Sequence, residues 1–395
     1  MSKPIEALQN LMAKGSRRMA SRSRHAVKMG GEGVNDAMTA TRRAGEGVRD
    51  RGVNLLKALV RAVRRPIRQR RRRRNRLEEQ REFDQVTWGI ERELEEIGSR
   101  GRMVVVGPWF SEVGFETLYW IPFLHWVKAA LRLESSRVVA VSRGGVSAWY
   151  AGLADRYLEI WDDFDPVAFS KRNAARGTTK QHEVSDLDRD VLAKVAARLG
   201  TTDFDVIHPS LMYRLFTLYW SGHRPMSFVD THTRFVTHDV KPIIDPALLP
   251  REYLAVKLYA ARSLPDSPEM RERLRGMVRA AAEQLPVVLL DTGLVLEDDH
   301  ADYALGGDRI ISAKPWMTPQ NNLGVQTQIV AGAKGFLGTC GSIAWMAPRL
   351  GVNTSALYVD PKWLHAHLAV AMRAYFKLNA GTFAAADLRA IDNKW

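Results

Sequence analysis

The sequence predicts an α/β protein with two doubly wound parallel-sheet domains that face each other across a cleft. Two observations lead to this prediction. Short apolar runs, of the kind that is buried on both faces of a parallel sheet, alternate with helix-length segments from Met103 onward. A proline-rich stretch at residues 241–251, KPIIDPALLPR, interrupts the alternation, which then restarts. We therefore expect domains at residues 98–245 and 246–395, preceded by a basic extension of residues 1–97.

The basic extension carries the positive charge of the chain. The 395 residues have a formal net charge of +14. Residues 1–76 hold 22 Lys and Arg against 5 Asp and Glu, which leaves about −3 for the remainder. Apolar residues recur at helical spacing from Val53 to Val63, and five arginines follow at Arg70–Arg74. A basic amphipathic helix beside an arginine block favours an anionic membrane surface. Nucleic acid, or a disordered tail without a specific partner, is the alternative.

The single cysteine and the hydropathy pattern indicate the compartment. Cys340 is the single cysteine and cannot form an internal disulfide, which is consistent with a reducing compartment. The sequence shows no histidine that would pair with Cys340, so we do not expect a thiol nucleophile. The N-terminal residues lack the continuous apolar region of a secretory signal, and no segment offers about 18 uninterrupted apolar residues. We expect a cytoplasmic protein without a membrane span, held to the inner face of the membrane by its basic extension.

Each domain is expected to alternate strands with helices. The strands of the first domain are predicted at Met103–Val106, Arg137–Val141, Tyr157–Trp161 and Asp205–Ile207. Those of the second are predicted at Tyr253–Leu258, Val287–Leu290, Arg309–Ser312, Gly335–Leu337 and Ser355–Val359. Helices are expected over Glu112–Arg132, Ser267–Gln284 and Thr327–Ala333. Alternation of this kind implies right-handed crossovers and parallel sheets.

The stretch VVVGPWFSEVGFETLYW, residues 104–120, is the first candidate site. In doubly wound sheets, ligands bind beyond the carboxyl ends of the strands, where the loop after Val106 is expected. Glu112 and Glu116 are four residues apart and would share one face of the following helix. A carboxylate at this place could serve as a general base. The alternative is that Glu112 only favours the helix dipole and Glu116 is a solvated helix residue.

The stretch GFLGTCGSIAW, residues 335–345, is the second candidate site. A short apolar strand leads into Gly338, Thr339, Gly341 and Ser342, followed by a helix expected from about Ile343. Small residues between a strand and a helix N-terminus can bind a diphosphate through free backbone N–H groups. Neither the dinucleotide nor the P-loop fingerprint is present, and the same residues could act only as turn and cap.

Together these motifs resemble the donor-binding half of GT-B fold glycosyltransferases. The similarity lies in the strand, the Gly-Thr-x-Gly-Ser loop, the following helix and the later Leu-Gly-Val turn. It implies two Rossmann-like domains and a nucleotide-sugar donor, which is a substrate, with no cofactor and no metal. Lys257 and Arg262, in YLAVKLYAARSLPD, match the family's basic positions at the diphosphate. The resemblance also implies that the loop after the first strand supplies the catalytic base, hence Glu112 with Glu116 in support.

Further candidates lie at other expected strand ends. His208 could be a base or an acceptor contact, although a capped histidine is the more common role. Lys314, Trp316, Gln320 and Asn321 could hold the nucleotide base and ribose. The triplets Asp163-Phe164-Asp165 and Asp203-Phe204-Asp205 resemble metal-binding D-x-D motifs, but we interpret them as loop and strand-edge aspartates.

These observations predict a metal-independent glycosyltransferase that acts on an envelope polysaccharide or a lipid-linked acceptor. One alternative keeps the fold but changes the reaction to epimerisation of a nucleotide sugar. The other is a non-enzymatic adaptor that docks on nucleic acid or membrane through the arginine-rich extension.

Overall fold

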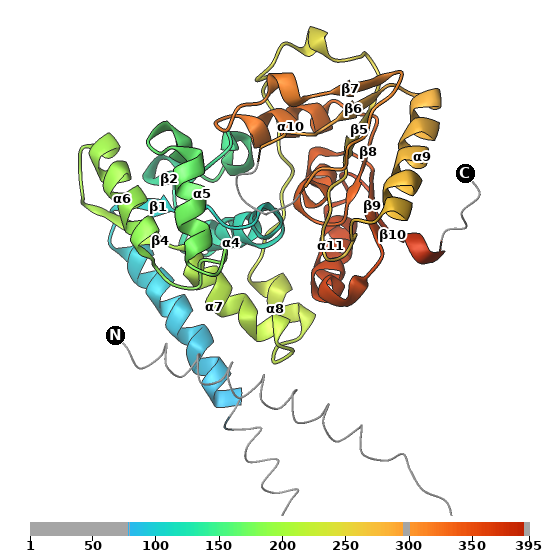
Figure 1. Ribbon diagram of the computed structural model, residues 1–395. Coiled ribbons are helices and arrows are strands. Elements are labelled where there is room, and N and C mark those ends of the chain that lie inside the picture. The colour runs from blue at the N-terminus through green and yellow to red at the C-terminus, as the bar shows by residue number, and fades with distance from the viewer. Residues whose placement is uncertain (1–77, 79, 295–300, 391–395) are drawn as a thin grey trace, which may run out of the picture. The chain divides into compact units, whose positions relative to one another are not determined.

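The computed structural model describes residues 78, 80–294 and 301–390 (Figure 1). The chain divides into two compact units, Met1–Trp88 and Gly89–Trp395. Most of the basic extension, including the segment after Val53 and the arginine run, lies outside the described residues. Residues 80–99 form one continuous helix. Ile90, Leu94 and Ile97 are buried at intervals of four and three residues, which is the pattern of an amphipathic helix.

The first sheet has four parallel strands in the order β3-β2-β1-β4. The strands are β1 (Met103–Val106), β2 (Val138–Ser142), β3 (Arg156–Glu159) and β4 (Phe204–Ile207). All four lie where the sequence predicted strands, within two residues at each end. Their connections contain α4 (Ile121–Leu131), α5 (Pro166–Ala175) and α6 (Asp186–Leu199), and α7 (Pro209–Trp220) and α8 (Met226–Thr231) follow.

One core cluster joins this sheet to two of its helices. Val105, Val139 and Val141 of the strands are buried in one cluster with Phe169 of α5 and Val191 of α6. The helix α6 begins and ends at sequence-encoded signals. Ser185 and Asp188 form a reciprocal capping box, and Gly200 ends the helix in the left-handed conformation.

The helix predicted over Glu112–Arg132 is not a single α-helix. It consists of a short α3 (Val113–Phe115), a π-helical turn η1 (Glu116–Trp120) and α4. Pro122 is the physical reason, since it cannot donate an N–H to the preceding turn, and the α-helical ladder cannot pass through it unbroken. The N–H of Ile121 instead donates to the carbonyl of Glu116, five residues back.

The second sheet has six parallel strands in the order β10-β9-β8-β5-β6-β7. They are β5 (Leu254–Lys257), β6 (Val287–Leu289), β7 (Ile310–Ser312), β8 (Gly335–Thr339), β9 (Thr354–Tyr358) and β10 (Phe383–Asp387). The helix α9 (Pro268–Gln284) lies along this sheet (Figure 1), and its Leu274 and Val278 share a core cluster with Val256 and Leu289.

Three elements of this half differ from the sequence prediction. The helix α10 (Asn322–Ala331) begins five residues earlier than expected, because it is buried almost throughout and shows no amphipathic period. The helix α11 (His365–Leu378) and the strand β10 were not predicted. The sequence of β10 is FAAAD, and alanine is depleted in strands.

Both sheets change winding direction next to their first strand. In the first sheet, β1 lies between β2 and β4, and in the second, β5 lies between β6 and β8. These are the topological switch points at which doubly wound sheets bind ligands. The prediction of an α/β protein with two doubly wound parallel sheets is confirmed.

Candidate functional site

The loop after β1 is fixed by both neighbouring strands. The N–H of Gly107 donates to the carbonyl of Ile207 in β4 (3.0 Å), and the N–H of Trp109 donates to Val141 in β2 (2.9 Å). Gly107 has φ of +119°, and a Cβ at this position would collide with the carbonyl of Val141. The glycine is therefore required where the chain leaves the sheet. The backbone that leads to Glu112 is thus tied to two strands.

Glu112 is the partly exposed carboxylate of this loop. It occupies the N-cap position of α3 with extended backbone angles, but its side chain does not cap the helix. Its Oε1 accepts a hydrogen bond from the hydroxyl of Thr179 (3.3 Å), in the loop between α5 and α6. The side chain is thus oriented by a neighbouring loop while it stays accessible to solvent. A general base needs this combination of orientation and access.

Glu116 has a different environment, although it lies one helical turn further on. It is completely buried, and its Oε1 accepts hydrogen bonds from the hydroxyls of Ser142 and Tyr150, both at 2.7 Å. Its Oε2 accepts from the guanidinium of Arg143 at 2.5 Å. Burial raises the pKa of Glu116, while Arg143 and the two hydroxyls act in the opposite direction. With three close polar contacts and no exposure, this carboxylate is suited to a structural role.

Arg143 connects the buried Glu116 to the loop that carries Glu112. Arg143 is also fully buried, and its Nη2 donates to the carbonyl of Ser111 at 2.5 Å. The hydroxyl of Ser111 is in turn hydrogen-bonded to that of Tyr213 (2.7 Å). Glu116 therefore acts on the residue before Glu112 through one arginine, which is a positioning role.

The Gly-rich loop after β2 binds a carboxylate of the protein itself, Glu159 at the end of β3. The N–H groups of Gly144 and Gly145 donate to the two oxygens of Glu159, at 3.0 and 2.8 Å. Both glycines have positive φ, and their N–H groups form the kind of concave backbone that often binds an anion. Glu159 occupies this place, so the loop's backbone donors are already used within the protein.

His208 caps α7 at the end of β4. Its Nδ1 accepts from the N–H of Ser210 (3.1 Å), and its Nε2 lies 2.9 Å from Oδ1 of Asp188. An accepting Nδ1 places the proton on Nε2, which therefore donates to Asp188. Both ring nitrogens of His208 form hydrogen bonds and its side chain is buried. These contacts favour the structural, helix-capping role over that of a base.

The second candidate loop follows β8, but no long helix begins after it. Gly338 and Thr339 end the strand, and the residues after Gly341 form two short 3₁₀ turns, Ser342–Trp345 and Ala347–Leu350. The helix expected from Ile343 is therefore corrected to these turns, because Pro348 and Gly351 leave too few residues for an α-helix. The helix-dipole argument for a diphosphate site does not apply here.

Local contacts fix the end of β8 against the segment that follows β5. The hydroxyl of Thr339 both accepts from the N–H and donates to the carbonyl of Tyr259, each at 2.9 Å. Gly341 has φ of +140°, and Ser342 has φ of +41°, which is unusual for a residue with a side chain. The loop thus has a specific, strained backbone shape next to the switch point between β5 and β8.

The structure brings the two candidate loops together. Gly114 lies so close to Ser342 that a Cβ on Gly114 would be 3.2 Å from the Ser342 nitrogen. The hydroxyl of Thr117 lies 3.4 Å from the carbonyl of Ser342, in addition to its bond to Val113 (3.1 Å). Residues that are more than 220 positions apart in the sequence are therefore in contact, and Gly114 lies two residues after the partly exposed Glu112.

The two basic residues predicted at the diphosphate, Lys257 and Arg262, differ in exposure and in their partners. Lys257 ends β5, and its ammonium group donates to Asp302 (2.7 Å) and to the carbonyl of Leu290 (2.8 Å). Arg262 is exposed, with its guanidinium 5.4 Å from the ring centre of Trp363. Lys257 is thus neutralised by a carboxylate, whereas Arg262 remains at the surface.

Lys314 and Trp316 form a short 3₁₀ turn after β7. The Lys314 side chain lies over Gly293, in the loop after β6. A Cβ on Gly293 would be 2.8 Å from the Lys314 ammonium nitrogen. Asn321 precedes α10, and its side-chain amide lies 3.5 Å from the carbonyl of Trp316. These residues belong to the β6–β7 side of the second sheet.

Sequence reasoning missed four residues that contact Glu112 or an aromatic side chain of this region: Thr179, Lys180, His182 and His367. The first three belong to a loop with no strand or helix signal. His367 lies on the unpredicted α11, and its Nδ1 is 2.7 Å from the hydroxyl of Tyr119. Only the polar run TTKQH, between two helical patterns, could have indicated a functional loop.

The D-x-D aspartates have structural partners. Asp163 pairs with Arg198, and Asp165 caps α5 by accepting from the N–H of Ala168. Asp203 and Asp205 pair with Arg102 and Arg100, respectively. Within residues 78, 80–294 and 301–390, no group of three or more His, Cys, Asp or Glu side chains could hold a metal ion.

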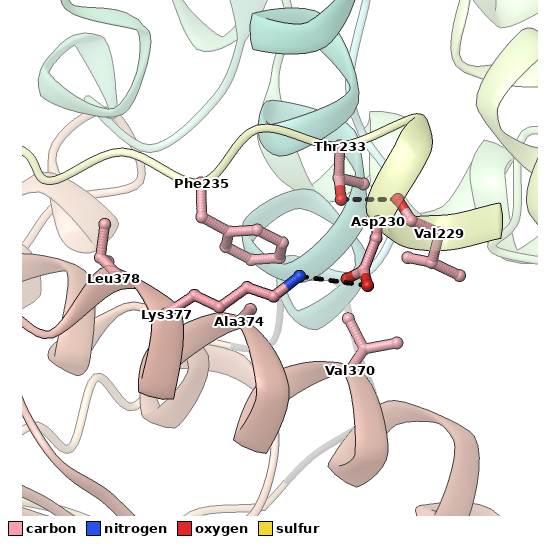
Figure 2. Close-up of a pocket in the computed structure, with 8 residues that line it drawn as sticks. All are labelled: Val229, Asp230, Thr233, Phe235, Val370, Ala374, Lys377 and Leu378. Atoms are coloured by element: carbon pink, nitrogen blue, oxygen red, sulfur yellow. Dashed lines mark hydrogen bonds and ion pairs between the residues drawn. The ribbon is translucent and has the colours of Figure 1, made fainter. Parts of the chain in front are cut away.

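A hollow of about 280 Å³ lies between α8 and α11, as Figure 2 shows. Val229, Phe235 and Val370 supply apolar walls, and Lys377 crosses it to reach Asp230 (3.1 Å). None of the residues predicted for the site lines this hollow.

Comparisons with known proteins concern the fold. No protein-family model matches the chain, and no curated protein sequence matches it. Among solved structures, a glycosyl transferase family 9 protein from Veillonella parvula DSM 2008 aligns at 13% identity over 66% of this chain and 81% of its own, with a TM-score of 0.37.

An E. coli heptosyltransferase solved with ADP aligns at 14% identity over 72% of this chain and 93% of its own, with a TM-score of 0.35. A Listeria monocytogenes protein provisionally described as a UDP-N-acetylglucosamine 2-epimerase aligns at 15% identity over 65% of this chain and 79% of its own, with a TM-score of 0.31. At these identities and scores the similarity describes the arrangement of sheets and helices, not a substrate or a reaction.

Proposed function

We propose that the chain is a glycosyltransferase that moves a sugar from a nucleotide-sugar donor to a hydroxyl of a glycan or lipid-linked acceptor, without a metal ion. The observation that carries the proposal is the contact between the two candidate loops. Each loop leaves its sheet at the switch point, where doubly wound sheets bind ligands, and Gly114 meets Ser342 there. Two substrates bound at the two switch points would therefore come close to each other.

Glu112 is the proposed general base. Its carboxylate would take the proton of the acceptor hydroxyl as the hydroxyl oxygen attacks the anomeric carbon, while the bond from that carbon to the diphosphate oxygen breaks. Thr179 orients the carboxylate, and Glu116 acts through Arg143 on the backbone of Ser111. Direct displacement of this kind inverts the anomeric configuration.

The leaving diphosphate is assigned to the ends of β5 and β8. Arg262 follows β5, and the loop with Gly341 and Ser342 follows β8. A fixed cation and backbone donors that face the developing charge stabilise the transition state. The positive charge of Lys257 is balanced by the carboxylate of Asp302. We therefore assign the larger electrostatic effect on the diphosphate to Arg262.

A thermal-shift panel with UDP, GDP, ADP, CDP and dTDP, in EDTA, tests the proposal. A ligand at 100 times its dissociation constant adds about 2.7 kcal/mol of stability, enough to raise the melting temperature by a few degrees. One nucleotide should give a clear shift, and Arg262→Ala should reduce it. The absence of a shift with all five nucleotides would overturn the proposal. A nucleotide sugar converted to another nucleotide sugar, with no acceptor present, would instead identify an epimerase.

We place the enzyme at an anionic membrane surface through the arginine-rich segment of residues 53–74. Among the described residues, no helix has both the length and the apolar character needed to cross a bilayer. Binding through positive charge and an amphipathic segment would bring the enzyme to lipid-linked acceptors.

A further inference from the structure

The loop between α5 and α6 brings a lysine and a histidine to two aromatic residues, Phe115 and Tyr213, and Phe115 follows Glu112 by three residues. The ammonium group of Lys180 lies 4.5 Å from the ring centre of Phe115, in contact distance for a cation–π interaction. The ring of His182 lies 4.8 Å from the ring of Tyr213, which in turn packs 5.7 Å from Phe115. Lys180 and His182 therefore approach the same aromatic pair.

Lys180 differs from the other basic residues of this region in its charge balance. Arg172 of α5 pairs with Asp190 (2.7 Å), and Arg189 of α6 pairs with Asp186 (2.5 Å). Lys180 forms no such ion pair with any residue that the structure describes. Its positive charge is partly exposed and unbalanced by a carboxylate.

The position of this charge is set by the loop that orients Glu112. Thr179, directly before Lys180, donates its hydroxyl to Glu112 (3.3 Å). The N–H of Lys180 donates to the hydroxyl of Thr178 (3.1 Å), which constrains the turn. Gln181, directly after Lys180, is buried and tied to Pro108 and Phe110 of the β1 loop at 2.8 and 3.1 Å. The backbone of Lys180 is therefore held on both sides, directly after the residue that contacts Glu112.

We propose that Lys180, supported by His182, binds a phosphate or diphosphate ester on the acceptor, next to the hydroxyl that Glu112 activates. This inference rests on the proposed function. A partly exposed ammonium group without a carboxylate partner is a suitable site for a phosphate dianion, because each of its three N–H groups can donate to an oxygen. A neutral acceptor would gain nothing from this charge.

The experiment uses the full chain and two soluble probes, glucose 1-phosphate and farnesyl diphosphate, titrated by calorimetry. The variants are Lys180→Met, Lys180→Arg and Arg262→Met, and the control is Lys171→Met, on the exposed face of α5. Lys180→Met keeps the apolar stem on Phe115, so loss of binding would report the charge and not the packing. It should weaken binding about tenfold or more, since a charge-assisted hydrogen bond is lost. Lys180→Arg and Lys171→Met should stay within about threefold of the unsubstituted protein.

Other outcomes would overturn the inference. Equal affinity for the probes in Lys180→Met and the unsubstituted protein would do so, as would no binding of either probe. A loss in Arg262→Met but not in Lys180→Met would place the anion at the donor loop. Binding of only farnesyl diphosphate would identify a lipid-linked source of the phosphate, and binding of only glucose 1-phosphate a sugar phosphate. Since nucleotide binding is measured separately, its failure would refute the proposed function without deciding the role of Lys180.

Discussion

At the scale of single residues, the two glutamates of the β1 loop show how one helical turn separates two roles. Glu112 is partly exposed and accepts a hydrogen bond from Thr179, whereas Glu116 is buried against an arginine and two hydroxyls. Desolvation favours the neutral form of a buried carboxylate, and an ion pair restores the charged form. The same residue type therefore serves as a candidate base in one place and as an internal support in the other.

Glu112→Gln tests the base. The amide keeps the size of the side chain and its hydrogen bond with Thr179 but cannot accept a proton. We expect kcat to fall by a factor of about 10²–10⁴, the usual effect of losing a general base, with nucleotide affinity unchanged. Turnover measured with saturating donor, and nucleotide binding measured by calorimetry, are the two readouts. Unchanged turnover would eliminate Glu112 as the base.

Glu116→Gln should act mainly on stability. It leaves the guanidinium of Arg143 buried without its carboxylate, and breaking a buried pair in this way costs about 3–5 kcal/mol. Urea unfolding of this variant should show the loss, while Glu112→Gln should stay within about 1 kcal/mol of the unsubstituted protein because its site is partly exposed. The double variant Glu116→Gln, Arg143→Met should be more stable than Glu116→Gln alone. If Glu116→Gln and Glu112→Gln unfold at the same urea concentration, Glu116 does not support the loop.

The sequence predicted the position of Glu112 at a strand end, but it did not predict the burial of Glu116. The partners of Glu116 come from β2 and the turn after it, more than 25 residues away. Spacing within one helix contains no information about such contacts. The same holds for Thr179 and Lys180, whose importance depends on a loop that local patterns do not place.

At the scale of elements, close packing between α10 and the β2 loop ties the two sheet-bearing halves together. The N–H of Gly324 donates to the carbonyl of Gly144 (2.8 Å), and the backbone of Gly145 lies against Gly324 itself. The indole N–H of Trp149 also donates to the hydroxyl of Thr327 (2.9 Å), both side chains being buried. The register of α10 against this loop is therefore fixed at several points.

Gly324→Ala should disturb this contact. A Cβ at Gly324 would overlap the backbone of Gly145, which cannot move without breaking its bond to Glu159. We expect a loss of about 1–3 kcal/mol, the cost of overpacking a close contact. Gly276→Ala, in α9, is the matched control because no atom lies within 4 Å of its Cβ position. It should raise stability by about 0.5–1 kcal/mol through better helix propensity. Equal effects of the two substitutions on the melting temperature would contradict the proposed contact.

Element boundaries were predictable where composition and period agreed. Every predicted strand is present because each is a short, apolar run bounded by loop residues. The failures have identifiable causes: Pro122 converts part of one helix into a π-helical turn, and buried α10 lacks an amphipathic period. The alanine-rich sequence of β10 has low strand propensity, so the strand is stabilised by its pairing with β9.

At the scale of the whole molecule, stability should fall in mild acid because a partly buried histidine is kept neutral. Burial lowers the pKa of His367 from 6.5 to about 4, with a smaller effect from the charge of Lys180. The folded-state pKa lies below the unfolded one, so the stabilisation is complete above pH 6.5 and is lost as the pH falls toward 4. This group accounts for at most about 3 kcal/mol.

Urea unfolding at a series of pH values measures this loss. His367→Gln should show a smaller decrease in unfolding free energy between pH 6.5 and 4 than the unsubstituted protein. Carboxylates titrate in both proteins, so their contribution cancels in the comparison. Parallel curves for the two proteins would show that His367 is already protonated in the folded state or solvated as in the unfolded chain.

The final prediction concerns the uneven charge of the chain, which joins a strongly basic N-terminal segment to a remainder of about −3. Vesicles that contain anionic phospholipid should bind the full chain, and binding should weaken as salt rises, because each basic residue near the surface contributes about 1 kcal/mol and is screened. Replacing Arg70–Arg74 by serine should reduce binding by at least a hundredfold while leaving nucleotide binding unchanged. Neutral vesicles and a nucleic-acid duplex complete the comparison. Equal binding to neutral vesicles would exclude an electrostatic mechanism, and tighter binding to the duplex, lost with the same five substitutions, would favour the nucleic-acid alternative.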